Sequence, residues 1–326
     1  MKEEEIRKRD LFDKYLELVE KDVKDFFDFR DFERTSCPAC RSRDLKGEFE
    51  KLGFAYGTCR KCSTLFVDPR PSFETLRRFY SSSPSTDFWV NKFFMPVAEA
   101  RREKIFKPRA EYVSGLIENR SGNVIGDVGA GFGLFLEELK KISPRNRYIA
   151  IEPSLEMAEI CKSKGLEAVC SCLEDTDGLE ETFDILTAFE LAEHLYNPEA
   201  FFSKAYSLIK PGGHFIMTTL NGKGFDILLL WDDSKSVTPP HHLNFFNPAS
   251  IGLLLQRVGF SDIEVSTPGK LDWDIVEGMI VRDGIDLGRF WNVAANELKE
   301  EDKKALQEWI VRCNLSSHMR VVARKC

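Results

Sequence analysis

The sequence predicts an α/β fold with a mostly parallel sheet, preceded by a small cysteine-containing module and a helical cap. Strand-like and helix-like apolar patterns alternate through the second half of the chain, as a parallel sheet with crossover helices requires. A glycine-rich turn at residues 127–133 joins one strand to the next helix, and two Cys-x-x-Cys pairs lie within the first 70 residues. The predicted divisions are an N-terminal helix over 1–35, a cysteine module over 36–70, a helical linker or cap over 71–120 and the sheet domain over 121–326.

Length and composition describe an ordinary protein with a real core. The 326 residues predict about two domains, and 43% apolar with 30% charged residues is typical of soluble chains. A net charge of −7 argues against a surface that binds nucleic acid. Because no segment reads as a signal peptide or membrane span, we expect a cytoplasmic protein without membrane contact. Nine cysteines without a secretion signal favour thiols and metal ligands over disulfides.

The first segment predicts an amphipathic helix. Residues Glu3 to Phe27 are highly charged but place apolar side chains at helical spacing. We expect this helix to dock on the body of the protein or on a second copy, which would make a homodimer. A solvated helix without a specific partner is the alternative.

The cysteine pairs predict a zinc ribbon. Two Cys-x-x-Cys knuckles separated by residues 41–58 can each supply two thiolates to one tetrahedral Zn²⁺. The four expected ligands are Cys37, Cys40, Cys59 and Cys62. A site closed by four thiolates is structural rather than catalytic.

The positions after the second cysteine of each knuckle are unusual. Arg41 and Ser63 stand where many knuckles carry glycine in left-handed geometry, which costs roughly 1 kcal/mol each if that geometry is kept. Nucleic-acid binding by basic ribbon residues is a sharper alternative to a purely structural module. Those residues are Arg41, Arg43, Arg60 and Lys61.

The segment after the ribbon predicts a cap of helices. Ser72 is placed to cap a helix with Glu74 in its first turn, and Tyr80, Phe88 and Trp89 precede a longer helical run from Pro96 to Glu118.

The glycine-rich turn predicts a small-molecule site. Three glycines follow an acid in the spacing Asp-x-Gly-x-Gly-x-Gly, between an apolar strand and a helix. A dinucleotide fingerprint starting at Gly129 would need its third glycine at Leu134, which it lacks. A carboxylate at Asp127 would repel a pyrophosphate and attract a cationic ligand. The spacing resembles the first motif of the class I S-adenosylmethionine (SAM) methyltransferases.

The flanks of the turn support this interpretation. The strand Arg147 to Ile151 ends at Glu152 and Pro153, where nucleoside-binding folds place a carboxylate on the ribose hydroxyls. The resemblance places Cys172 and Leu173 near the adenine, and we expect Cys170 and Cys172 to be small buried side chains rather than reactive thiols. The cofactor-binding residues that follow are Asp127, Gly129, Ala130, Gly131, Gly133, Glu152, Pro153, Cys172, Leu173, Phe189 and Glu190.

The remaining elements complete the sheet. Strands are predicted over Leu166 to Val169, Phe183 to Phe189, His214 to Leu220, Phe260 to Ser266 and His318 to Arg324. A loop, residues 222–247, separates the fifth strand from the next helix, and residues 270–315 form a helical insertion between the last two strands. Glu190, Glu193, His194 and Asn221 all follow strand ends, at the edge where open parallel sheets bind ligands.

Several phrases together resemble bacterial class I methyltransferases that carry a zinc ribbon. They are the four-cysteine ribbon, LFVDPRPSFETLRRFY, the glycine turn, AFELAEHL, KPGGHFIM, HHLNFFNPAS and LSSHMRVVARK. This resemblance implies a Rossmann-like sheet whose last strand is antiparallel, with SAM and a structural Zn²⁺ as cofactors. Many such enzymes methylate sugar nucleotides, surface polysaccharides or natural products, so the implied acceptor is a small molecule, in particular a sugar hydroxyl.

The expected chemistry is an in-line attack on the SAM methyl group by oxygen, nitrogen or carbon. An attacking hydroxyl must lose a proton, and histidine is the natural base near neutral pH. The candidates are His241 and His242, in the loop after the fifth strand, and His194. We expect His214 and His318 to be structural.

Two other functions are compatible with the motifs. The protein could methylate RNA or protein with the ribbon as the reader, although its net acidity counts against RNA. It could also bind SAM without catalysis, although the intact Asp127, glycines and Glu152 argue against decay.

Overall fold

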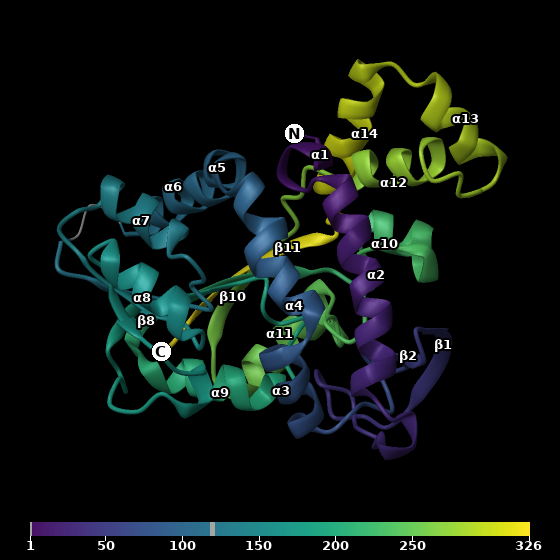
Figure 1. Ribbon diagram of the computed structural model, residues 1–326. Coiled ribbons are helices and arrows are strands. Elements are labelled where there is room, and N and C mark those ends of the chain that lie inside the picture. The colour runs from purple at the N-terminus through teal and green to yellow at the C-terminus, as the bar shows by residue number, and fades with distance from the viewer. Residues whose placement is uncertain (1, 118–120) are drawn as a thin grey trace. The chain divides into compact units, whose positions relative to one another are not determined.

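The computed structural model describes residues 2–117 and 121–326, so residues 118–120 of the expected helical cap lie outside the described residues. Two compact units each contain one sheet, and each is described separately (Figure 1). Unit 1 comprises Met1–Ala98, Leu220–Ile251 and Ser266–Met319. Unit 2 comprises Glu99–Thr219, Gly252–Val265 and Arg320–Cys326.

A seven-stranded sheet organises unit 2. Its strand order is β10-β11-β8-β7-β4-β5-β6. The strands are β4 (Val124–Val128), β5 (Arg147–Ile151), β6 (Glu167–Val169), β7 (Phe183–Phe189), β8 (Ile209–Leu220), β10 (Ser261–Ser266) and β11 (His318–Arg324). Strand β4 pairs in parallel with β5 and β7, β5 with β6, and β7 with β8. The carboxyl ends of these five strands therefore meet at one edge.

The last strand runs against its neighbour, as the resemblance implied. Lys325 exchanges backbone hydrogen bonds with Gly212 and Gly213 near the start of β8, whereas the Asn221 amide bonds to Ser317 O just beyond its end. Strand β11 is thus antiparallel to β8 and lies between β8 and β10. The Rossmann-like sheet predicted from the sequence is confirmed.

Helices before and between the strands cover this sheet. They are α5 (Ala98–Arg101), α6 (Lys107–Leu116), α7 (Leu134–Ile142), α8 (Leu155–Ser163), α9 (Pro198–Leu208) and α11 (Pro248–Val258). Val113 of α6 and Leu136 of α7 are buried in one core with Ile125 and Tyr148 from the sheet. The caps predicted at Ser154 and Asn197 are present, since each side chain accepts a backbone N–H of its helix.

A four-stranded antiparallel sheet, ordered β1-β2-β3-β9, organises unit 1. Its strands are β1 (Leu45–Lys51), β2 (Phe54–Cys59), β3 (Leu65–Val67) and β9 (Asn244–Phe245). The helices of this unit are α1 (Glu3–Ile6), α2 (Arg9–Phe26), α3 (Phe73–Ser82), α4 (Pro84–Phe88), α10 (Phe225–Leu230), α12 (Asp272–Val281), α13 (Arg289–Glu297) and α14 (Glu300–Arg312). Three strands come from the cysteine module, and the fourth comes from the loop after β8.

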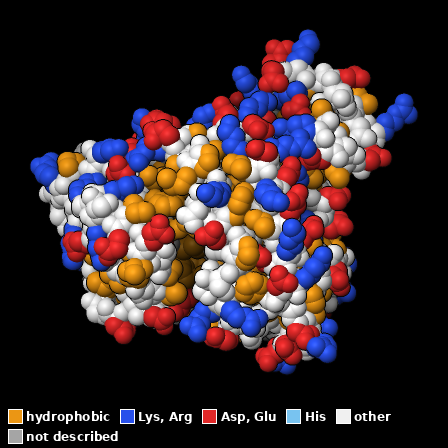
Figure 2. Space-filling model, viewed as in Figure 1, with side chains coloured by type: hydrophobic (Ala, Val, Ile, Leu, Met, Phe, Trp, Pro, Cys, Tyr) orange, Lys and Arg blue, Asp and Glu red, His pale blue; other side chains and the backbone are white. Residues whose placement is uncertain are grey.

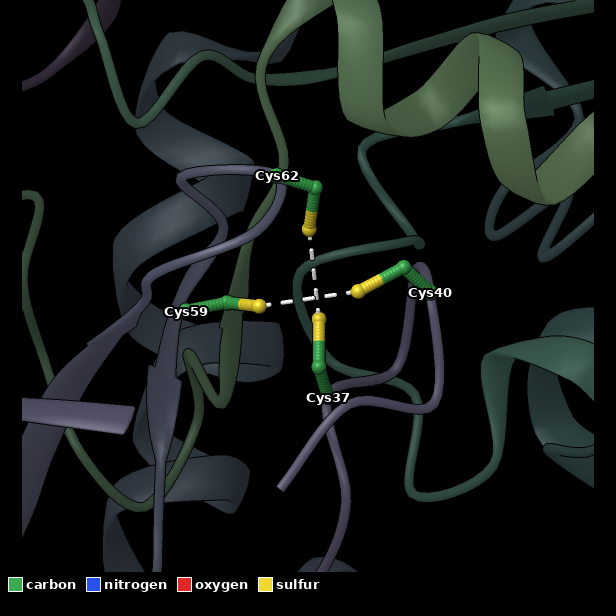
Figure 3. A group of neighbouring side chains, drawn as sticks. All are labelled: Cys37, Cys40, Cys59 and Cys62. Carbon is green, nitrogen blue, oxygen red and sulfur yellow. Dashed lines mark hydrogen bonds between the residues drawn. The ribbon is translucent and has the colours of Figure 1, made fainter. Parts of the chain in front are cut away.

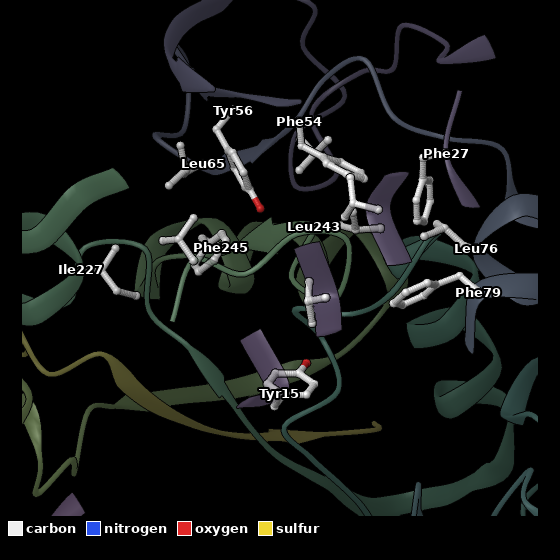
Figure 4. Close-up of a cluster of buried hydrophobic side chains, with 14 of the residues drawn as sticks. Tyr15, Phe27, Phe54, Tyr56, Leu65, Leu76, Phe79, Ile227, Leu243 and Phe245 are labelled. Carbon is white, nitrogen blue, oxygen red and sulfur yellow. The ribbon is translucent and has the colours of Figure 1, made fainter. Parts of the chain in front are cut away.

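The N-terminal helix belongs to the core of unit 1. Tyr15, Val19 and Val23 of α2 are buried with Phe79 of α3 and Phe54 of β2 (Figure 4). The apolar side of α2 therefore packs on the chain's own body, one of the two dockings that its periodicity predicted.

The segment after β10 folds into the predicted helical insertion. Helices α12, α13 and α14 pack around Trp273, Val276 and Ile310, together with Phe225 of α10. Asp272 at the start of α12 accepts hydrogen bonds from Ser316 Oγ and from the Ser317 amide and hydroxyl, which fixes the return of the chain to β11.

Two local predictions were wrong. The region expected to be a loop, residues 222–247, contains α10 and the strand β9, because a two-residue strand has no period of its own and exists only by pairing with β3. Strand β8 begins at Ile209 rather than His214, because Ile209 already pairs with Phe183 ahead of a register shift.

Across the described residues, each helix is too short or too polar to cross a membrane. On the face shown in Figure 2, basic side chains lie among acidic ones.

Candidate functional site

The glycine turn of unit 2 has left-handed backbone at three places. Gly129, Gly131 and Gly133 have φ values of +65°, +54° and +69°, which other residues adopt only with strain. A Cβ on Gly133 would lie 2.9 Å from both Cys161 Sγ and Leu166 Cδ1, whereas no atom lies within 4 Å of a Cβ built on Gly131. The turn is therefore packed against Cys161 of α8 and Leu166 at Gly133, and it is open beside Gly131, where a ligand can approach the backbone.

Glu152 holds this turn in place. Its carboxylate, at the end of β5, accepts the Gly131 N–H at 2.8 Å and the Ser154 N–H at 2.9 Å. Burial raises the pKa of Glu152, and the two N–H groups oppose that rise. A carboxylate fixed beside the open side of the turn suits hydroxyl groups such as those of a ribose.

Asp127 is buried at the end of β4. Its Oδ1 accepts a hydrogen bond of 2.6 Å from Thr187 Oγ1 of β7. Burial raises the pKa of Asp127 to about 7, against the Thr187 hydrogen bond and the charge of Arg109, while the charge of Glu152 raises it further. A cationic ligand would favour the ionised form of this acid.

Glu190 follows β7 in a left-handed conformation, with φ of +53°. Its carboxylate accepts Thr218 Oγ1 at 2.7 Å and pairs with the Arg109 guanidinium. That guanidinium also lies 4.8 Å from the centre of the Phe189 ring. The predicted residues Phe189 and Glu190 are thus joined to a cation from α6.

Arg109 was missed by the sequence analysis. It lies on a helix before β4, in a segment without a motif, and only its charge could have drawn attention. Its ion pair with Glu190 and its effect on Asp127 place it at the carboxyl edge of the sheet.

Glu193 is a second buried acid at this edge. It is 2% exposed, and its Oε2 accepts Thr219 Oγ1 at 2.7 Å. Burial, followed by the charge of Glu190, raises the pKa of Glu193 to about 8. The candidate base His194 follows it in unit 2 and is half-buried.

The predicted adenine-contacting segment also lies at this edge. Leu173 is buried, and the Cys170 thiol lies 3.6 Å from Pro153 O, which links the loops that follow β5 and β6. Cys170 and Cys172 are exposed, so their expected burial was wrong. Leu173 begins a short helical turn, Leu173–Asp175, and it is the buried residue of that turn.

The two candidate bases in unit 1 differ sharply. His241 is 6% exposed, and its ring lies against those of Tyr15, Phe79 and Tyr80, with centroids 4.9 to 5.6 Å away. His242 is half-buried, and its Nδ1 lies 2.6 Å from Ser236 O. Because a carbonyl oxygen only accepts, Nδ1–H donates this hydrogen bond, which fixes the orientation of the ring.

The four predicted metal ligands come together in unit 1 (Figure 3). Sulfur atoms of Cys37 and Cys62 lie 3.4 Å apart, and those of Cys40 and Cys59 lie 3.5 Å apart. All four lie within 4.8 Å of one another, a spacing that one tetrahedrally coordinated ion can span.

The unusual knuckle positions keep the left-handed geometry. Arg41 and Ser63 have φ values of +59° and +58°. Their amides bond to the carbonyls of Cys37 and Cys59, which closes each knuckle. The knuckle fold is therefore kept without glycine, at roughly the 1 kcal/mol per position expected.

Comparisons with known proteins identify the domain that contains the glycine turn. A family profile described as methyltransferase domain matches residues 97–265. The ubiquinone biosynthesis O-methyltransferase of Xanthomonas axonopodis pv. citri (strain 306) is 28% identical over 171 residues, which cover 48% of this chain and 70% of that protein. The mitochondrial ubiquinone biosynthesis O-methyltransferase of Mus musculus is 32% identical over 130 residues, which cover 37% of this chain and 34% of that protein.

A solved structure shares the fold. A chain in the complex of the Haloferax volcanii Trm112 methyltransferase activator with a methyltransferase aligns with a TM-score of 0.52 at 14% identity. The alignment covers 73% of this chain and 96% of that one. The matched domain spans more than half of this chain and contains the glycine turn, Glu152 and Glu190, so the chain belongs to the methyltransferase-domain family and is a class I SAM-dependent methyltransferase.

Proposed function

We propose that the protein methylates a hydroxyl group of a small molecule, with a sugar or nucleotide sugar as the acceptor. The observation that carries a hydroxyl acceptor is the His242 ring, whose Nδ1–H donates to Ser236 O, which makes Nε2 the ring nitrogen that would accept a proton. The names of the relatives, O-methyltransferases, support oxygen as the attacking atom. The resemblance to ribbon-carrying enzymes favours a sugar, and a phenol is the competing small-molecule acceptor.

The protein's own groups divide the work. SAM supplies the methyl group on a sulfonium, and S-adenosylhomocysteine leaves as a neutral thioether when the methyl is transferred. Glu152 and the open side of Gly131 would hold the nucleoside, and Asp127 would supply negative charge for the cationic end. His242 Nε2 accepts the acceptor's hydroxyl proton, and Nδ1–H remains bonded to Ser236 O, which stabilises the imidazolium that forms.

We propose that the four thiolates bind one structural Zn²⁺. The donor set is all sulfur and complete, so it leaves no open position for a substrate. Asn247 Nδ2 donates to Cys62 O at 2.9 Å and to Ser63 O at 3.0 Å, and supports the second knuckle.

The acceptor class is tested by incubating the protein with SAM and separate nucleotide sugars, free sugars and phenols. Mass spectrometry should show a gain of one methyl group on a nucleotide sugar. After acid has released the sugar from the nucleotide, the methyl group should remain on the sugar as an ether. Methylation of phenols alone would move the acceptor to the competing class. Methylation of RNA or protein, with every small molecule unchanged, would contradict the proposal.

The pH dependence of SAM binding tests Asp127. Below about pH 7 this buried acid is largely protonated, and binding a cation requires it to ionise. SAM affinity measured by calorimetry should therefore rise with pH by up to about tenfold per unit below 7 and level off above it. The Asp127→Asn protein should bind more weakly and lose most of this slope. A wild-type slope retained in the variant would assign the titration to another group.

Turnover of single-histidine variants tests the base. His242→Gln should lower kcat by roughly 10²–10⁴-fold and leave SAM affinity within about twofold, because the ring removes a proton without holding the cofactor. His194→Gln is the matched substitution in unit 2 and should lower kcat much less. If His194→Gln lowers kcat more than His242→Gln does, the base is His194.

Metal analysis tests the ribbon. The purified protein should contain about one zinc per chain, and Cys59→Ser should lose it together with several kcal/mol of unfolding free energy, because zinc binding by such modules is coupled to folding. Cys313→Ser, which changes an exposed thiol, is the control and should keep both. A Cys59→Ser protein that retains zinc and stability would refute the site.

A further inference from the structure

The sheet of the cysteine module includes a strand from the loop that carries His242. Leu65 and Phe66 of β3 pair with Phe245 and Asn244 of β9, and the Val67 amide donates to Leu243 O at 3.0 Å. The backbone bonded to the ribbon thus begins at the residue after His242.

The hairpin β1–β2 holds the rest of this loop through two side chains. Tyr56 is 1% exposed, and its hydroxyl donates to the backbone oxygen of His242 at 2.8 Å. Its ring lies within the core shown in Figure 4 and packs against Phe49 and Phe245. Lys51 Nζ donates to the backbone oxygens of Asp232 and Ser234, at 2.7 and 2.8 Å.

Along the chain, these contacts lie before and after the Ser236 carbonyl, which orients the His242 ring. Ser236, whose carbonyl fixes the His242 tautomer, follows the segment held by Lys51. The His242 carbonyl itself is held by Tyr56. At the far end of the loop, the side-chain amide of Asn247 donates to Cys62 O and Ser63 O in the second knuckle.

The strands involved are too short to hold this arrangement alone. Strand β3 has 3 residues and β9 has 2, and so small an antiparallel pair needs outside support. The four cysteines supply it, because they fix both ends of the β1–β2 hairpin and the start of β3.

We propose that the cysteine module is a positioning element for catalysis, and that Tyr56 is the residue through which it holds the backbone of the base His242. This inference rests on the proposed function, in which His242 accepts the acceptor's proton. It gives the ribbon a task in methyl transfer, because the ribbon holds the backbone of the proposed base.

The test is Tyr56→Phe in the full-length protein, which removes one hydroxyl and keeps the ring. The expected result is a fall in kcat of roughly tenfold, the size of one lost buried hydrogen bond, with SAM affinity and zinc content unchanged. Deuterium uptake of peptides from residues 236–246 should rise, while that of residues 124–152 should not. Lys51→Met, which keeps the apolar stem, should raise uptake in residues 231–246 in the same way.

The matched control is Tyr148→Phe. The Tyr148 hydroxyl also donates to a backbone oxygen, Ser143 O at 2.6 Å, but lies in unit 2 at the opposite end of β5 from Glu152. It should change neither kcat nor uptake in residues 236–246. Unchanged uptake in both Tyr56→Phe and Lys51→Met would overturn the inference.

The same series separates this inference from the proposed function. If His242→Gln loses turnover while Tyr56→Phe keeps full kcat, the positioning role is wrong and the proposed function stands. If His242→Gln also keeps full turnover, the base assignment fails, and the positioning of His242 fails with it.

Discussion

The hydrogen bonds that Glu152 accepts from the Gly131 and Ser154 amides are the constraint on which the shape of the glycine turn depends. Three left-handed glycines give the turn a shape that few sequences can adopt, and the carboxylate at the end of β5 holds the amide of the middle one. The same carboxylate bonds the amide of Ser154, which caps α8. One side chain therefore aligns two strand ends and a helix start at the sheet edge where open α/β folds bind ligands.

Charge at this edge gives the turn its selectivity. Asp127, Glu190 and Glu193 are buried or half-buried beside Arg109, and burial raises the pKa of Asp127 and of Glu193, so a cationic ligand would favour their ionised forms. Threonines from β7 and β8 orient all three carboxyl groups. Such an edge would disfavour a pyrophosphate and favour a sulfonium with an ammonium group, the distinction that the Asp-x-Gly-x-Gly-x-Gly spacing predicted.

Most of the fold and the cofactor site followed from local patterns. Strands β5 and β7 matched their predicted bounds because buried strands leave apolar runs, and the knuckles and caps matched because each needs particular residues at fixed spacing. Arg109 escaped because an ion pair between a helix and a distant strand end has no local period. Strand β9 escaped for the same reason, since its partner β3 lies far away in the sequence. The choice of His242 over His241 depended on a backbone carbonyl and three aromatic rings, which only the tertiary structure brings together.

The acid-flanked glycine turn should select a cationic adenosyl ligand over a dinucleotide. Calorimetric titration of the native protein with SAM and, separately, with NAD compares the two directly. We expect one SAM bound per chain and no measurable heat of binding with NAD. Binding of NAD at one per chain, with SAM unable to displace it, would contradict this selectivity.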